Sequence, residues 1–77
     1  MDKKTIINEL VEILMLDNYN VDQTKIEFDS MSSLMLVEFL DSNFNITISK
    51  EEIKSFETIN SVLKFIDLKL SNFGGKH

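Results

Sequence analysis

The stretch EFDSMSSLMLVEFL, from Glu27 to Leu40, places three serines directly after an aspartate and then runs almost wholly apolar. Apolar side chains that recur every three or four residues predict an amphipathic helix, here over about residues 30–44. Aspartate and serine are preferred at helix starts, so the segment carries its own start signal. The helical phase assigns one face of this helix to the core: Ser33, Leu36, Val37, Leu40 and Phe44.

The opposite face of this helix is also partly apolar. It carries Met31, Leu34, Met35, Glu38, Asp41 and Ser42. Because a face that meets only water is mostly polar, this mixture of flexible methionines, a leucine and acids favours a protein-docking surface. The alternative is that the long preceding loop folds over Leu34 and Met31 and buries them.

An N-terminal helix is predicted from about Lys3 to Leu16, with Asp2 as its N-cap. Polar and apolar residues separate cleanly on two arcs of this helix. The apolar arc holds Ile6, Ile7, Leu10, Val11, Ile13 and Leu14.

Two more helices are predicted after residue 44. A capping box of Ser49 and Glu52 opens a short helix over about residues 50–56. Thr58 can cap a last helix over about residues 59–70, and a flexible tail over residues 71–77 follows. The core face of the last helix holds Ile59, Val62, Leu63, Ile66 and Leu70. The chain is thus predicted to be a single all-α domain, a small four-helix bundle with three long helices and one short helix.

The composition excludes several classes of protein. The 77 residues include no cysteine, which excludes disulfides and cysteine-based metal sites. There is neither a signal peptide nor a membrane-span pattern, so a cytoplasmic monomer is expected. The net charge is −5, and no lysine occurs between Ile26 and Ser49. This acidic middle argues against nucleic acid or anionic lipid as a partner and favours a basic protein surface.

The loop before the central helix partly matches a calcium-binding loop. Asn18, Asn20 and Asp22 fall at its first, third and fifth positions, and Asp29 falls at its twelfth. However, Gln23 stands where such loops need glycine, and aspartate is shorter than the usual final glutamate. We therefore reject a calcium site.

Among the three serines, only Ser30 combines expected exposure with a helix N-terminus. Ser33 is expected in the core, and Ser32 on the far flank beside Asn43. A helix start favours a bound phosphate, although Ser30 or the aspartate before it could simply be a cap. A catalytic serine would need a positioned base, and the only histidine is His77 at the extreme C-terminus. The chain is therefore not expected to be an enzyme.

The run DSMSSLMLVEFLDSNFNITIS, residues 29–49, resembles the motif of acyl carrier proteins. Asp29-Ser30-Met31 stands where that family has Asp-Ser-Leu, and a Phe-x-Ile-x-Ile segment over residues 44–48 follows the helix. The resemblance extends over nearly the whole chain and implies a four-helix bundle of acyl-carrier type. It also implies that Ser30 carries 4′-phosphopantetheine, transferred from coenzyme A by a phosphopantetheinyl transferase, with Asp29 as the adjacent motif residue.

The resemblance further implies that 4′-phosphopantetheine forms a flexible arm and that its terminal thiol holds an acyl or aminoacyl group as a thioester. The partners would be a loading enzyme and a downstream synthase, transferase or thioesterase, which would dock on the partly apolar face from Met31 to Ser42. Two departures stand out. Met35 and Ser42 replace acids common in fatty-acid carriers, and Glu27-Phe28 replaces the common Leu-Gly pair. They favour a dedicated polyketide, nonribosomal-peptide or aminoacyl-transfer pathway over general fatty-acid synthesis. The alternative is an unmodified helical interaction module that uses the Met31, Leu34 and Met35 face.

Overall fold

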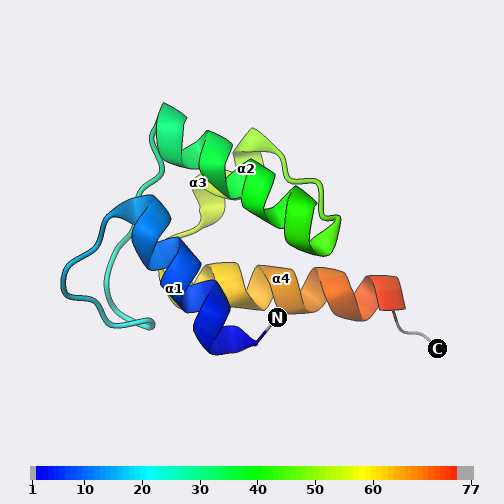
Figure 1. Ribbon diagram of the computed structural model, residues 1–77, viewed down its shortest axis with the longest axis horizontal. Helices are drawn as coiled ribbons and strands as arrows, with labels where there is room; N and C mark the ends of the chain where they lie inside the picture. Colours follow the sequence, from blue (N-terminus) through cyan, green and yellow to red (C-terminus); the bar gives the residue numbers. More distant parts are fainter. Residues whose placement is uncertain (1, 75–77) are drawn as a thin grey trace.

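The chain folds into four helices, and the computed structural model describes the backbone of residues 2–74 and the side chains of residues 2–71. The helices are α1 (Lys3–Leu14), α2 (Ser30–Phe44), α3 (Lys50–Ser55) and α4 (Ile59–Gly74) (Figure 1). No β-strand occurs within residues 2–74. The prediction of a small all-α bundle with three long helices and one short helix is therefore confirmed.

In Figure 1, α4 runs along the longest axis of the molecule, and α1 packs against both α2 and α4. The short helix α3 lies behind α2 in this view, next to the segment that leads into α4. The long loop between α1 and α2 is tied to the start of α4 by two backbone hydrogen bonds. The amide of Ile26 donates to the carbonyl of Glu57 at 2.9 Å, and the amide of Asn60 donates to the carbonyl of Val21 at 2.8 Å.

Side chains start the helices where the sequence predicts. Asp2 accepts a hydrogen bond from the amide of Thr5 at 2.9 Å. Ser49 and Glu52 form the predicted reciprocal capping box at the start of α3. At the start of α4, Thr58 and Ser61 each accept a hydrogen bond from the other's amide. Orphan amides of these helix starts are satisfied locally, as capping requires.

The C-terminal ends of the helices differ from the prediction. Helix α1 ends at Leu14 and not at Leu16, because Met15 adopts a left-handed conformation with φ of 56°. The amide of Leu16 then donates to the carbonyl of Val11 at 3.0 Å, which is the wrap typical of a Schellman motif. Helix α3 likewise ends at Ser55, one residue earlier than predicted.

Helix α4 is longer than predicted and ends at Gly74. The predicted tail over residues 71–77 is therefore wrong for residues 71–74, and residues 75–77 lie outside the described part of the chain. Residues 71–73 contain no proline or glycine, so nothing in the sequence stops the helix before Gly74.

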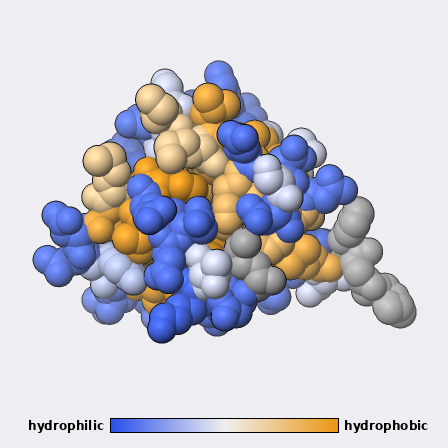
Figure 2. Space-filling view, in the orientation of Figure 1, coloured by the Kyte–Doolittle hydropathy of each residue, from blue (hydrophilic) through white to orange (hydrophobic). Residues whose placement is uncertain are grey.

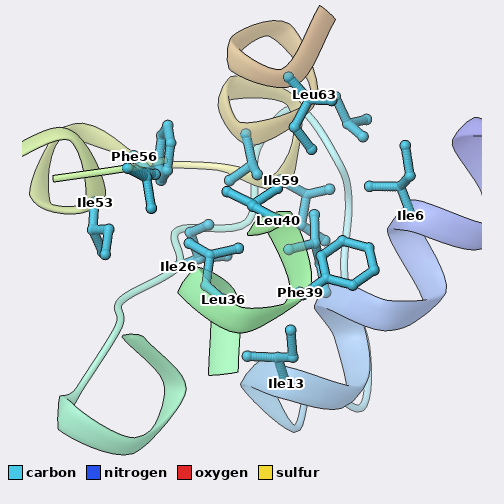
Figure 3. Packing of buried hydrophobic residues seen from close by; sticks show 14 of the residues in the cluster. Ile6, Ile13, Ile26, Leu36, Phe39, Leu40, Ile53, Phe56, Ile59 and Leu63 are labelled. Atoms are coloured by element: carbon cyan, nitrogen blue, oxygen red, sulfur yellow. The ribbon is translucent and has the colours of Figure 1, made fainter. Parts of the chain in front are cut away.

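The core is built from all four helices and from the connections between them. Figure 3 shows core side chains of α1, α2 and α4 converging, with Ile53 and Phe56 beside α3. The most deeply buried are Leu10, Leu36, Leu40, Ile59 and Val62. The remaining buried apolar residues are Ile6, Ile13, Ile26, Phe39, Ile46, Ile48, Ile53, Phe56, Leu63 and Ile66. Each long helix thus contributes a row of buried apolar side chains, and the loop before α2 contributes the buried Ile26.

The buried stripe of α2 is rotated from the predicted one. Phe39, which the prediction left off the core face, is buried and contacts Phe44 edge to face at 5.9 Å between ring centroids. Val37 and Phe44 are only half-buried, and the predicted core residue Leu70 of α4 is exposed. Because α2 is apolar on both sides, hydrophobic periodicity alone does not identify which side faces the core.

We predict that Leu36→Ala lowers the free energy of unfolding by about 2–5 kcal/mol, because it empties a fully buried position. That is a large part of the roughly 4–12 kcal/mol expected for a chain of this size. Leu34→Ala, two residues away on the exposed side, should cost less than about 1 kcal/mol. Urea unfolding followed by circular dichroism measures both variants. Equal losses would contradict the observed phase of α2.

Candidate functional site

The start of α2 is held by a capping box between Asp29 and Ser32. The carboxylate of Asp29 accepts from the amide of Ser32 at 2.8 Å, and the Ser32 hydroxyl accepts from the amide of Asp29 at 2.8 Å. The same hydroxyl also lies 2.8 Å from the Asp29 carboxylate. The buried serine of the cluster is therefore Ser32, and the prediction that placed Ser33 in the core and Ser32 on an outer flank is wrong. Ser33 is half-buried.

The hydrogen bonds from Ser32 lower the pKa of Asp29 below its ordinary value, with the backbone amide as the largest cause and the hydroxyl second. Donors that stabilise the charged form favour ionisation, so this carboxylate is negatively charged at neutral pH. It faces Ser32 and acts as the helix cap. Ser30 does not have that role.

Ser30 is the first residue of α2 and is exposed. The first amides of a helix have no intrahelical partner, and the helix dipole favours negative charge there. Asp29 satisfies the amide of Ser32. Ser30 thus presents a hydroxyl to solvent at a helix start, as the sequence predicts, while the neighbouring serine completes the cap.

Ser30 lines an open groove of about 1150 Å³. Its lining comes from α2, from α3 and from the connecting segments next to these helices. The lining residues are Lys25, Ile26, Glu27, Phe28, Asp29, Ser30, Ser33, Leu34, Val37, Ile48, Lys50, Ile53, Lys54 and Phe56. Sequence reasoning did not find this groove, because it depends on how α3 and the loop before α2 pack beside α2.

The outer face of α2 is uncovered. Met31 is 68% exposed, Leu34 is 66% exposed and Met35 is 43% exposed. The loop before α2 therefore does not bury Met31 and Leu34, which was the alternative to docking. The polar members of the predicted docking face, Glu38, Asp41 and Ser42, are exposed as well. Figure 2 shows apolar side chains gathered on the surface over the N-terminal half of α2.

The loop that partly matches a calcium site is organised by a turn. Asn20 accepts hydrogen bonds through its side chain from the amides of Asp22 and Gln23, at 2.9 Å and 3.1 Å. Among the residues that the structure describes, no three His, Cys, Asp or Glu side chains gather closely enough to hold a metal ion. His77 lies outside the described residues.

The chain matches no protein-family model, no curated protein and no solved structure. Within the described part of the chain, no helix has the length and the hydropathy needed to cross a membrane. The function must therefore be inferred from the start of α2, the groove and the outer face of α2.

We predict that Ser32→Ala lowers the free energy of unfolding by about 0.5–2 kcal/mol, because it breaks the capping box and leaves the amide of Asp29 without its acceptor. Ser30→Ala should change stability by about 0.5 kcal/mol or less, since its hydroxyl is exposed. Parallel urea unfolding of the two variants makes the comparison. A larger loss for Ser30→Ala would show that Ser30 is the cap.

The lowered pKa of Asp29 also predicts a dependence on pH. Because the pKa is lower in the folded chain, this carboxylate stabilises the fold above the ordinary carboxyl pKa of about 4. The contribution is lost as the pH falls through the folded-state pKa. Asn is an equally good cap that does not titrate. Asp29→Asn should therefore match the wild type near neutral pH and lose less stability in acid.

The midpoint of urea unfolding, measured from neutral pH down to about pH 2, tests this expectation. Asp2 and Glu52 also have lowered pKa values through their own cap hydrogen bonds, so the Asn variant should keep part of the acid sensitivity. If the unfolding midpoints of the wild type and of Asp29→Asn fall in the same way with pH, Asp29 contributes nothing to the acid sensitivity.

Proposed function

We propose that the chain is a carrier protein of acyl-carrier type that bears 4′-phosphopantetheine on Ser30. The observation that carries the proposal is the position of this serine. Ser30 is exposed at the first position of α2, directly after Asp29, and it lines a groove. Of the three serines in the cluster, Ser30 alone is exposed, and its side chain takes no part in the capping box.

The residues around Ser30 fit the group. A phosphodiester on the Ser30 oxygen would lie at a helix start, where orphan amides and the dipole favour negative charge. The adjoining groove has apolar and polar lining residues that suit an arm built from amides and methyl-bearing carbons. When attached, the group supplies a thiol that holds an acyl or aminoacyl cargo as a thioester.

This function requires no catalytic base in the chain. The transferase would activate the Ser30 hydroxyl. The oxygen–phosphorus bond forms, the phosphoanhydride bond of coenzyme A breaks and the adenosine bisphosphate leaves. The chain is then a substrate and not an enzyme.

The outer face of α2 would serve as the docking surface for partner enzymes. It combines the exposed side chains of Met31, Leu34 and Met35 with the acids Glu38 and Asp41. Apolar contacts would supply binding energy, and the acids would speed the approach of a basic partner and orient it. The partners would be a phosphopantetheinyl transferase, a loading enzyme and a downstream synthase, transferase or thioesterase. The non-acidic Met35 and Ser42 on this face favour a dedicated pathway over general fatty-acid synthesis.

The second candidate is an unmodified interaction module, which the exposure of Met31 and Leu34 favours. A partner helix with an apolar stripe could bind this face without any change at Ser30. The two functions differ in which residue they need: the carrier needs Ser30, while the module needs the apolar face.

The deciding experiment is the intact mass of the chain after incubation with coenzyme A, Mg²⁺ and a broad-specificity phosphopantetheinyl transferase. We predict one added phosphopantetheine on the wild type and none on Ser30→Ala. Ser33→Ala is the matched control, since it removes a neighbouring hydroxyl that also lines the groove, and it should gain the group.

No mass gain by the wild type with several transferases would overturn the carrier function. The unmodified interaction module would then be the favoured function. In that case, Met35→Glu should weaken binding of the partner more than Ser30→Ala does. A mass gain by Ser30→Ala would show that the group is attached to another residue.

A further inference from the structure

We propose that Lys50 and Lys54 of α3 hold the phosphodiester of the Ser30 arm across the groove, so that the arm lies along the groove when no partner is bound. The inference rests on the proposed function. It assigns a role to two residues outside the motif and outside the outer face of α2, and it concerns the resting position of the arm.

Residues of α2 and residues of α3 both line the groove. The wall from α2 presents Ser30, Ser33, Leu34 and Val37, which share one side of that helix. The wall from α3 presents Lys50, Ile53 and Lys54, which likewise recur at spacings of three and four residues. Ser30 of α2 and the two lysines of α3 thus line one groove.

Apolar side chains line the rest of the groove. Ile26, Ile48 and Phe56 are buried core residues that also line it. Phe28 packs edge to face on Phe56, with ring centroids 6.4 Å apart. From Ser30 to Val37, the α2 wall is about 10 Å long, so the groove can take a stretch of the arm beyond its phosphate.

The charges around the groove leave Lys50 and Lys54 available for an anion. Of the other charged groups that line it, Lys25 pairs with Glu57 at 3.6 Å, and the Asp29 carboxylate is bound to Ser32. In the described part of the chain, neither Lys50 nor Lys54 has a carboxylate oxygen within 4.0 Å, since the ion pairs found there involve other lysines.

Glu27 is the remaining charged group along the groove, and it is exposed. Among the residues that line the groove, lysines outnumber acids, whereas Glu51 and Glu52 of α3 do not line it. A phosphodiester on Ser30 would bring the complementary charge to the groove, and ammonium groups on flexible stems are suited to binding it.

The test compares the modified wild type with modified Lys50→Gln/Lys54→Gln. The control is Lys4→Gln/Lys64→Gln, which removes the same charge from exposed positions that do not line this groove. Mass spectrometry first confirms that each protein carries the group. Amide chemical shifts are then compared between the unmodified and modified forms, and the rate of thiol alkylation by an uncharged maleimide is measured.

In the wild type and the control, we expect modification to shift the amides of Ile48, Ile53 and Phe56. In Lys50→Gln/Lys54→Gln, these shifts should shrink, and the thiol should react about twofold to fivefold faster at low salt. The difference should decrease at high salt, because the contact is electrostatic and exposed.

Equal groove shifts and equal alkylation rates in both double variants would overturn the inference while leaving the carrier function intact. Failure of the wild type to gain the group would overturn both, and the mass measurement detects that failure before any shift is compared. Faster alkylation in the control as well would show that overall charge, and not the groove, governs the thiol.

Discussion

The capping box between Asp29 and Ser32 is the constraint on which the site depends. It fixes the residue at which α2 begins, and every later side chain of the helix follows at 100° per residue. With Ser32 turned inward to complete the cap, Leu36 and Leu40 fall into the core one and two turns later. Ser30 is then left outward at the first helical position. A shift of α2 by a single residue would bury a different serine and move the outer face.

The apolar content of α2 serves two separate surfaces. One stripe, centred on Leu36 and Leu40, joins the helices into one core. Met31 and Leu34 remain exposed on the other side, although covering them with the long loop would have removed apolar area from water. That loop is held elsewhere by its backbone bonds to the start of α4, and its buried Ile26 belongs to the core. The open outer face is therefore a property of the fold.

The sequence alone predicted the number, order and starts of the helices, because caps such as Asp2 and Ser49 are local signals. It also identified Ser30 as exposed at a helix start. It did not predict the phase of α2, since a helix that is apolar on both sides carries little periodic signal, and Phe39 was missed for that reason. The end of α1 at Leu14 depends on a left-handed Met15, for which no glycine or asparagine gave a signal. The groove depends on contacts distant in sequence and is visible only in the folded chain.

The outer face of α2 and the lining of the groove differ in their charged residues. The outer face of α2 carries acids and no lysine, whereas the α3 wall carries Lys50 and Lys54. A carrier must both shelter its arm and release it to a partner, which requires a weak hold. Exposed ion pairs contribute about 1 kcal/mol or less, so docking energy on the outer face would readily offset their loss. Because the two charged surfaces lie on different helices, the proposed partner binding and the proposed arm retention would each respond to mutations that leave the core residues unchanged.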